Sequence, residues 1–165
     1  MHSRPWLKRK HVNPENLESK AASLRGEGKT IATLNGSFDL LHAGHLYIIH
    51  QASLQADVLF LLLNTDQSIK QYKSLERPII PLEERLEMVA ALEFVNFVSS
   101  FEELDPKMIL SKIRPDVHVN CDEYGEDCIE AETVKSFGGK IHLVDRIDLL
   151  STSAIIEKIK GLQCV

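Results

Sequence analysis

Five short apolar segments of β-type composition alternate with helix-type segments along this chain of 165 residues, and the alternation limits the folds it can adopt. The expected strands cover residues 30–35, 58–64, 96–99, 117–120 and 140–144. Strands that alternate with helices favour a parallel sheet joined by right-handed helical crossovers. Helices then cover both faces, which explains why a strand such as 58–64 is apolar throughout. The sequence therefore predicts an α/β fold with a doubly wound parallel sheet of about five strands in a single domain.

Helices are expected between or after these strands, over residues 45–55, 81–92, 106–113, 126–137 and 152–160. Asn13 and Pro14 predict an earlier helix start, because asparagine caps helix N-termini and proline suits the first helical position. Gly26 is expected to end that helix. Residues 1–12 carry basic side chains around one tryptophan and are predicted to form a solvated tail. The domain is then expected to cover residues 13–165.

The overall composition excludes several classes of protein. A net charge of −5 argues against a nucleic-acid-binding protein that works through bulk electrostatics. The longest apolar run, Val58–Leu63, is too short to cross a membrane, and the N-terminus lacks the apolar core of a secretory signal. Cys121, Cys128 and Cys164 form no C-x-x-C pair, so we expect free thiols in a reducing compartment. These observations predict a cytoplasmic protein with no membrane or nucleic-acid partner.

The segment after the first expected strand has the features of a phosphate-binding turn. It reads Asn35-Gly-Ser-Phe-Asp-Leu-Leu-His42-Ala-Gly44-His45 and leads into an expected helix. The free N–H groups and the positive dipole end of a helix start attract anions. His42 and His45 can donate hydrogen bonds to phosphate oxygens, and Gly44, which has no Cβ, lets the backbone come close to a ligand. The alternative is an ordinary strand–helix turn whose histidines are merely polar.

Polar segments also follow the other expected strands. In open parallel sheets, ligands bind outside the carboxyl ends of the strands, where the strand order reverses. Potential phosphate donors follow the second, fourth and fifth strands, within residues 64–78, 120–124 and 151–153. An acidic chain therefore gathers many of its potential phosphate donors on one predicted edge.

Four basic residues on the second of these segments, or shortly after it, are candidate phosphate ligands: Lys70, Lys73, Arg77 and Arg85. Any one of them alone would be ordinary surface charge, and Arg85 also fits a helix start with acids in its first turn. Together they suit a triphosphate, which carries about four negative charges and needs several donors. The segment Ser151-Thr152-Ser153 has two compatible interpretations, because hydroxyl groups cap helices and also contact phosphate at a helix N-terminus.

Three motifs of this chain occur together in one known superfamily. G-x-F-D followed by H-x-G-H is matched by Gly36, Phe38, Asp39, His42, Gly44 and His45. The pattern N-(S/T)-D-x-S-x-K-x-x-K-x-x-x-R-P, followed by P-L-E-x-R, is matched from Asn64 to Arg85, and a Ser-Thr motif opens the last helix. The chain thus resembles the nucleotidyltransferase (cytidylyltransferase-like) superfamily over about residues 26–158, with most similarity to the heptose 1-phosphate adenylyltransferase domain of bacterial ADP-heptose synthases. The resemblance implies a Rossmann-like fold.

The resemblance also implies a role for each candidate residue. The catalytic residues would be His42, His45 and Lys73. The nucleotide would be bound by Gly36, Ser37, Phe38, Gly44, His45, Arg85, Asn120, Ser151, Thr152 and Ser153, and the phosphorylated acceptor by Asn35, Asp39 and Arg77. No residue is assigned as a metal ligand, because the expected cofactor, Mg²⁺, would bridge phosphate oxygens and keep several waters. Asp39 could bind it through water or act only in the turn. We expect ATP and a phosphorylated small molecule as partners, and a homodimer.

Two segments bear on the identity of the substrates. Residues 93–98 are more similar to the E-A-V-D-W-V of the heptose group than to the corresponding segment of cytidylyltransferases, which favours ATP over CTP. Residues 119–124 read V-N-C-D-E-Y where the heptose group usually has V-K-G-G-D-Y, so a lysine and two glycines are lost.

Three functions stay open. The first transfers AMP from ATP to D-glycero-D-manno-heptose 1-phosphate, giving ADP-heptose and pyrophosphate. The second transfers a nucleotidyl group to another phosphate such as glycerol 3-phosphate or FMN, and the third is non-catalytic nucleotide binding.

Overall fold

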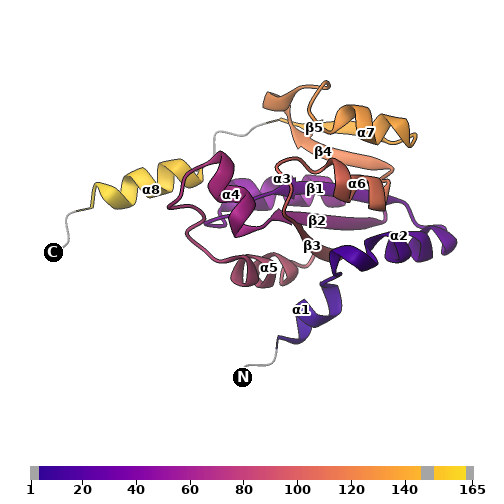
Figure 1. The fold of residues 1–165 in the computed structure, drawn as a ribbon, viewed down its shortest axis with the longest axis horizontal. Helices are drawn as coiled ribbons and strands as arrows, with labels where there is room; N and C mark the ends of the chain where they lie inside the picture. Colours follow the sequence, from indigo (N-terminus) through magenta and orange to yellow (C-terminus); the bar gives the residue numbers. More distant parts are fainter. Residues whose placement is uncertain (1–3, 146–150, 163–165) are drawn as a thin grey trace.

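The computed structural model describes residues 4–145 and 151–162, which contain a five-stranded sheet (Figure 1). The strands are β1 (Ile31–Gly36), β2 (Val58–Asn64), β3 (Phe97–Phe101), β4 (Val117–Cys121) and β5 (Lys140–Val144). They pair in parallel in the order β3-β2-β1-β4-β5. The predicted α/β architecture is confirmed, and every predicted strand overlaps an observed one.

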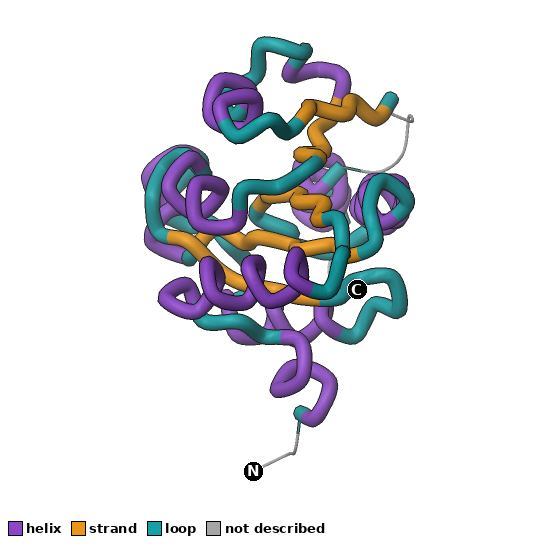
Figure 2. Tube along the Cα trace, turned by 90° about the vertical axis from the view of Figure 1, so that its right-hand side faces the viewer, coloured by secondary structure: helices purple, strands orange, loops and turns teal. Residues whose placement is uncertain are grey.

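Helices cover both faces of the sheet, as Figure 2 shows. One face is packed by α1 (Pro5–Lys10), α3 (Ala43–Ser53) and α5 (Leu82–Ala90), and the other by α2 (Leu17–Gly26), α6 (Lys107–Ile113) and α7 (Ala131–Ser136). Along β2, Leu59 and Leu61 pack into the first core and Phe60 and Leu62 into the second. Because both faces of β2 are covered, every one of its positions is buried.

The strand order reverses beside β1. The chain places β1, β2 and β3 successively outward and then returns to put β4 on the other side of β1. The chain leaving β1 continues into α3 on one face, whereas the chain leaving β4 continues to α7 on the other. The two connections separate at the carboxyl ends of β1 and β4, and this separation leaves a crevice where ligands bind in such sheets.

The prediction of a solvated tail before residue 13 is wrong for the described part of that segment. Pro5 begins α1, and Trp6 and Leu7 pack against the core cluster that includes α5. The Lys10 ammonium donates to the Leu92 carbonyl at 2.8 Å, and His11 forms a β-bridge with Val98. Two apolar side chains among the basic ones are enough to give this short helix a buried face.

Two further elements differ from expectation. The segment after β2, for which no helix was predicted, begins with α4 (Asp66–Tyr72), whose N-terminus is capped by Thr65, which accepts the Ser68 N–H at 3.2 Å. The helix predicted over 126–137 is shorter in the structure and consists of α7 alone. The chain before α7 forms a short 3₁₀ helix, η2 (Asp122–Tyr124), and then a loop that begins at Gly125 with φ +68°.

The predicted helix starts and ends near the N-terminus agree well with the structure. Asn13 occupies the N-cap position of the 3₁₀ helix η1 (Pro14–Asn16), although its side chain makes no capping hydrogen bond. This helix leads into α2, which ends at Gly26. The last helix is α8 (Thr152–Lys160). In the described ranges, no helix is both long and apolar enough to cross a bilayer.

Candidate functional site

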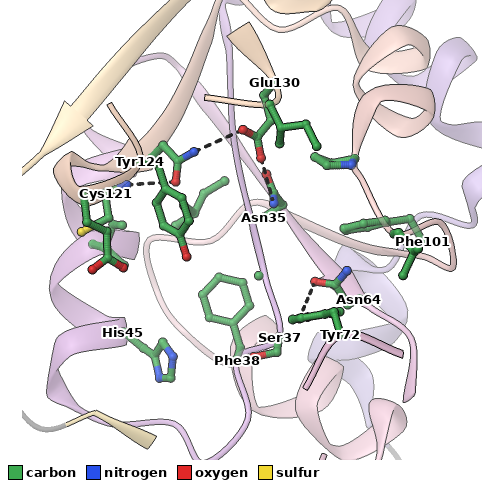
Figure 3. A pocket seen from close by; sticks show the side chains of 18 of the residues that line it. Asn35, Ser37, Phe38, His45, Asn64, Tyr72, Phe101, Cys121, Tyr124 and Glu130 are labelled. Carbon is green, nitrogen blue, oxygen red and sulfur yellow. Dashed lines mark hydrogen bonds between the residues drawn. The ribbon is translucent and has the colours of Figure 1, made fainter. Parts of the chain in front are cut away.

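Two adjacent cavities lie at the carboxyl edge of the sheet. The larger, of about 500 Å³, is lined by residues that follow β1, β2, β3 and β4 (Figure 3). The smaller, of about 330 Å³, is lined by the beginnings of α3 and α8 and by the end of β5. Both cavities are bordered by His45, Ile48, Lys73, Cys121 and Glu123. The structure therefore brings together the polar segments that the sequence placed on one edge.

The two histidines stand at the start of α3. His42 is the N-cap residue, and its Nδ1 accepts the Gly44 N–H at 3.1 Å. With Nδ1 acting as an acceptor, the proton of a neutral His42 lies on Nε2, which can donate to a ligand. The His42 and His45 rings stack with centroids 3.9 Å apart, and both border the smaller cavity. The Gly44 N–H is already used within the turn, and Gly44 itself borders the smaller cavity.

The surroundings keep both histidines neutral near pH 7. Burial lowers the pKa of His42 below its usual value. Burial, together with the nearby His42 and Lys73, lowers the pKa of His45 to about 4. The site can therefore offer N–H donors to phosphate without adding two positive charges to a cluster that already contains Lys73.

Lys73 lies where the two cavities meet. Its ammonium donates to the Ser37 hydroxyl at 3.0 Å, which connects the end of α4 to the turn after β1. Partial burial and the charge of Arg77 lower the pKa of this ammonium. Lys70, one helical turn earlier, is exposed and borders neither cavity. The structure thus distinguishes two lysines that the sequence pattern presents together.

The N-terminus of α8 closes the smaller cavity. Ser151 accepts the Ala154 N–H at 3.1 Å, which confirms the predicted cap, and Thr152 donates to the Asp39 carbonyl at 2.8 Å. Ser151, Thr152 and Ser153 all border the cavity. This helix start and the two histidines border the same cavity, an arrangement suited to anionic oxygens.

The structure corrects the assignment of Asp39 and Arg77 to substrate binding. Asp39 is fully buried, and its carboxylate accepts the N–H groups of Ile79 and Ile80 at 3.0–3.1 Å and the Arg77 Nε–H at 2.7 Å. Burial alone would raise the pKa of Asp39, but these hydrogen bonds and the Arg77 charge lower it overall. The pair holds the turn after β1 against residues 77–80. It borders neither cavity.

Arg85 was expected to contact the nucleotide, and its position contradicts this. The side chain is completely buried. Its guanidinium donates to the carbonyls of Ser37 at 2.6 Å, Asn64 at 3.0 Å and Ile80 at 2.9 Å, and it pairs with Asp66 at 2.7 Å. Arg85 therefore connects the ends of β1 and β2 from beneath the site and acts as a positioning residue.

Replacing Arg85 by lysine should lower the free energy of unfolding by about 2–3 kcal/mol, because a lysine cannot reach three carbonyls that would be left buried without donors. Chemical denaturation measures this difference. The partly exposed ion pair between Arg4 and Glu87 provides the control, since Arg4→Lys should change stability by less than about 1 kcal/mol. Equal effects of the two substitutions would contradict the role given to Arg85.

The larger cavity contains a carboxylate that the sequence did not indicate. Glu130 is only 4% exposed, and its two oxygens accept the carboxamide N–H groups of Asn35 at 3.5 Å and Asn120 at 3.3 Å (Figure 3). Across the cavity, the Tyr72 hydroxyl donates to the Asn64 side chain at 3.4 Å. Glu130 lay within a predicted helix, where an acidic residue is usually solvated, so its sequence context carried no signal of a site.

The other predicted residues of the turn after β1 also border the larger cavity. These are Gly36, Ser37 and Phe38. A Cβ on Gly36 would lie 3.2 Å from the Phe38 ring, so only glycine fits there without displacing the ring. Phe38 and Leu40 adopt left-handed backbone conformations, with φ of 46° and 50°, on either side of Asp39. The turn is therefore held in an unusual shape by the buried contacts of Asp39 and Arg85.

The family profile described as cytidylyltransferase-like matches residues 33–158 of this chain. Bifunctional protein HldE of Alcanivorax borkumensis is 42% identical over 137 residues, which are 82% of this chain and 29% of that protein. Bifunctional protein HldE of Pseudomonas aeruginosa is 39% identical over 147 residues, which are 88% of this chain and 31% of that protein. The chain thus spans about three tenths of the length of these curated relatives.

Two solved structures share the fold. The lipopolysaccharide core biosynthesis protein from Thermoplasma volcanium superposes with a TM-score of 0.60 at 21% identity, over 74% of this chain and 100% of that one. Pantoate-beta-alanine ligase from Francisella tularensis, solved with beta-gamma ATP and beta-alanine, gives a TM-score of 0.63 at 16% identity, over 92% of this chain and 77% of that one. At these identities the likeness supports the architecture of the sheet and its helices.

Proposed function

The chain belongs to the cytidylyltransferase-like family and is a nucleotidyltransferase, and we propose that it transfers AMP from ATP to D-glycero-D-manno-heptose 1-phosphate. The products are then ADP-heptose and pyrophosphate. One observation carries the proposal: a cavity with phosphate-binding groups and a cavity with room for a sugar meet at His45 and Lys73. The pattern over residues 64–85 and the identity to HldE proteins support the choice of substrates.

The triphosphate is proposed to occupy the smaller cavity. The N-terminus of α8 and the Nε2–H of His42 would contact the β- and γ-phosphates, because both border this cavity alone. His45 and Lys73 border both cavities and would therefore contact the α-phosphate, where the bond changes take place. This placement gives each predicted catalytic residue a position along the triphosphate.

The proposed reaction needs no general base. A phosphate monoester is anionic near neutral pH, so one of its oxygens can bond directly to the α-phosphorus. The bond from the α-phosphorus to the oxygen that bridges it to the β-phosphate breaks, and pyrophosphate leaves. The protein then contributes position and charge: the Lys73 ammonium and the N–H groups of the neutral histidines stabilise the developing charge on the transferring group.

We propose that Mg²⁺ accompanies the triphosphate. Among the residues that the structure describes, no three His, Cys, Asp or Glu side chains lie together as a metal-binding set, and the Asp39 carboxylate is occupied by N–H donors. An ion held by phosphate oxygens and water would need few protein ligands. When bound, it would neutralise part of the triphosphate charge.

A screen for pyrophosphate release tests the proposed function. The purified chain is incubated with ATP or CTP and with heptose 1-phosphate, mannose 1-phosphate, glycerol 3-phosphate or FMN. Release with ATP and heptose 1-phosphate in clear excess over the other pairs is the expected result. Release with glycerol 3-phosphate or FMN instead would establish the second candidate function, which the altered segment 119–124 keeps open. Nucleotide binding without any release would identify a non-catalytic nucleotide-binding protein.

ATP is expected to be preferred over CTP by about five- to a hundredfold. Base selection rests on a few hydrogen bonds in a closed pocket, where each polar group left unpaired costs about 1–3 kcal/mol. A single mismatch of this size corresponds to the stated ratio. Competing the two nucleotides in one reaction with heptose 1-phosphate measures it directly. An excess of the cytidylyl product would overturn the adenylyl assignment and leave the nucleotidyltransferase activity in place.

A further inference from the structure

We propose that Glu130 is a specificity-determining residue that accepts hydrogen bonds from the hydroxyl groups of the phosphorylated acceptor. The inference rests on the proposed function and deepens it: the enzyme would recognise a polyhydroxylated phosphate ester and not merely a phosphate. In the larger cavity, the anionic end of the acceptor would then lie near Lys73 and its hydroxylated end near Glu130.

The Glu130 carboxylate is held in place by neighbouring side chains. Glu130 precedes the first turn of α7, and its side chain is held by one carboxamide from the end of β1, Asn35, and one from the end of β4, Asn120. Both contacts are long, at 3.5 and 3.3 Å, and each leaves its carboxylate oxygen a lone pair for another donor. In the described part of the chain, the buried Asn35 side-chain oxygen has no hydrogen-bond partner, so a second acceptor lies beside the carboxylate. The Cys128 thiol also interacts with the Glu130 carboxylate. The acceptor capacity that remains on the carboxylate and on the Asn35 oxygen suits hydroxyl donors.

The position of Glu130 assigns it to the acceptor and not to the triphosphate. In an in-line displacement the entering oxygen approaches from the side opposite the leaving group. Pyrophosphate is proposed to leave beside His42 and α8, which border only the smaller cavity, so the acceptor enters from the larger one. Figure 3 shows Glu130 at the upper end of that cavity and His45 at the lower end. A buried negative charge there also disfavours any pose that puts phosphate at the Glu130 end.

The walls of the larger cavity suit the body of a sugar. Phe101, Leu104 and Ile129 provide apolar surface, and the Tyr72 and Asn64 pair provides further polar groups on the side facing Glu130. Apolar walls with a few converging polar groups are typical of small-molecule sites. A carboxylate is a stronger hydrogen-bond acceptor than these neutral polar groups, so Glu130 should contribute more than they do to hydroxyl recognition.

The test compares Glu130→Gln with Glu132→Gln. Both substitutions remove one negative charge, but Glu132 lies on the exposed side of α7 and borders neither cavity. Pyrophosphate release is measured with ATP and either heptose 1-phosphate or methyl phosphate, which has no alcohol hydroxyl group. Glu130→Gln is expected to raise the KM for heptose 1-phosphate about ten- to a hundredfold, the scale of a lost hydrogen bond to a charged acceptor. The KM for ATP and the reaction with methyl phosphate should change less than threefold, and Glu132→Gln should behave as the wild type.

A merely structural role for Glu130 would impair both acceptors equally, and that result would overturn the inference. A rise in the KM for ATP alone would assign the carboxylate to the nucleoside and would also overturn it. If Glu130→Gln does not fold, the wild type is tested with deoxy analogues of mannose 1-phosphate, and at least one missing hydroxyl should cost tenfold or more. Equal use of all analogues would contradict the proposal. If the wild type releases no pyrophosphate with any acceptor, the proposed function itself fails, whereas release with an unchanged Glu130→Gln profile refutes this inference alone.

Discussion

Replacing His45 by alanine is expected to lower turnover about 10²- to 10³-fold while the protein stays folded, the scale observed when one transition-state donor is removed. His45 borders both cavities and stacks on His42, so its N–H lies where the transferring phosphate is proposed to pass. The pKa of about 4 keeps this side chain neutral, so the loss reflects a missing donor and not a missing charge. Steady-state kinetics of pyrophosphate release provide the measurement.

His50 provides the matched control for His45. It lies on the same helix, is exposed, and borders neither cavity. His50→Ala should keep turnover within about twofold of the wild type, and His42→Ala should resemble His45→Ala because both rings face the smaller cavity. Near-normal turnover in both His42→Ala and His45→Ala would rule out the proposed site.

Replacing Lys73 by alanine is expected to lower kcat/KM about 10²-fold or more, whereas Lys70→Ala should change it less than about threefold. Lys73 stands where the cavities meet and is held by the Ser37 hydroxyl at 3.0 Å, but Lys70 is exposed on α4 away from both cavities. The two variants lose the same charge within one turn of helix, so bulk electrostatics cancel in the comparison. Small and equal effects would show that this segment is an ordinary solvated basic stretch.

The sequence predicted most accurately the elements whose residue pattern fits one kind of secondary structure. β2 is apolar at nearly every position and buried on both faces, so no other element fits Val58–Asn64. The start of α3 was also clear, because its polar turn and its apolar helix follow each other directly. α1 and α4 were missed because each is short and mostly polar, and only packing on the finished sheet stabilises such helices.

The sequence predicted the location of the candidate site more accurately than the role of each residue in it. The rule that ligands bind beyond the carboxyl ends of parallel strands placed His45, Lys73 and Ser151 on one edge, and the structure shows them there. Asp39, Arg77 and Arg85 were assigned to ligands because a charged motif looks the same whether it faces a ligand or a backbone carbonyl. Only the folded structure distinguishes the two cases, since two of the carbonyls that Arg85 contacts, those of Ser37 and Asn64, are far from it in the sequence.

The left-handed backbone of Phe38 and Leu40 affects how the phosphate turn works. A non-glycine residue in this conformation costs about 1 kcal/mol or more, so a free peptide of this sequence would leave the shape quickly. In the folded chain the shape is fixed before any ligand arrives, and binding therefore does not have to order the turn. The contacts that stabilise the fold thus also hold the turn in the conformation that would bind phosphate. A glycine at position 40 would remove the backbone strain but would also widen the range of shapes open to the turn, so the strained leucine keeps the turn in one conformation at a cost in stability.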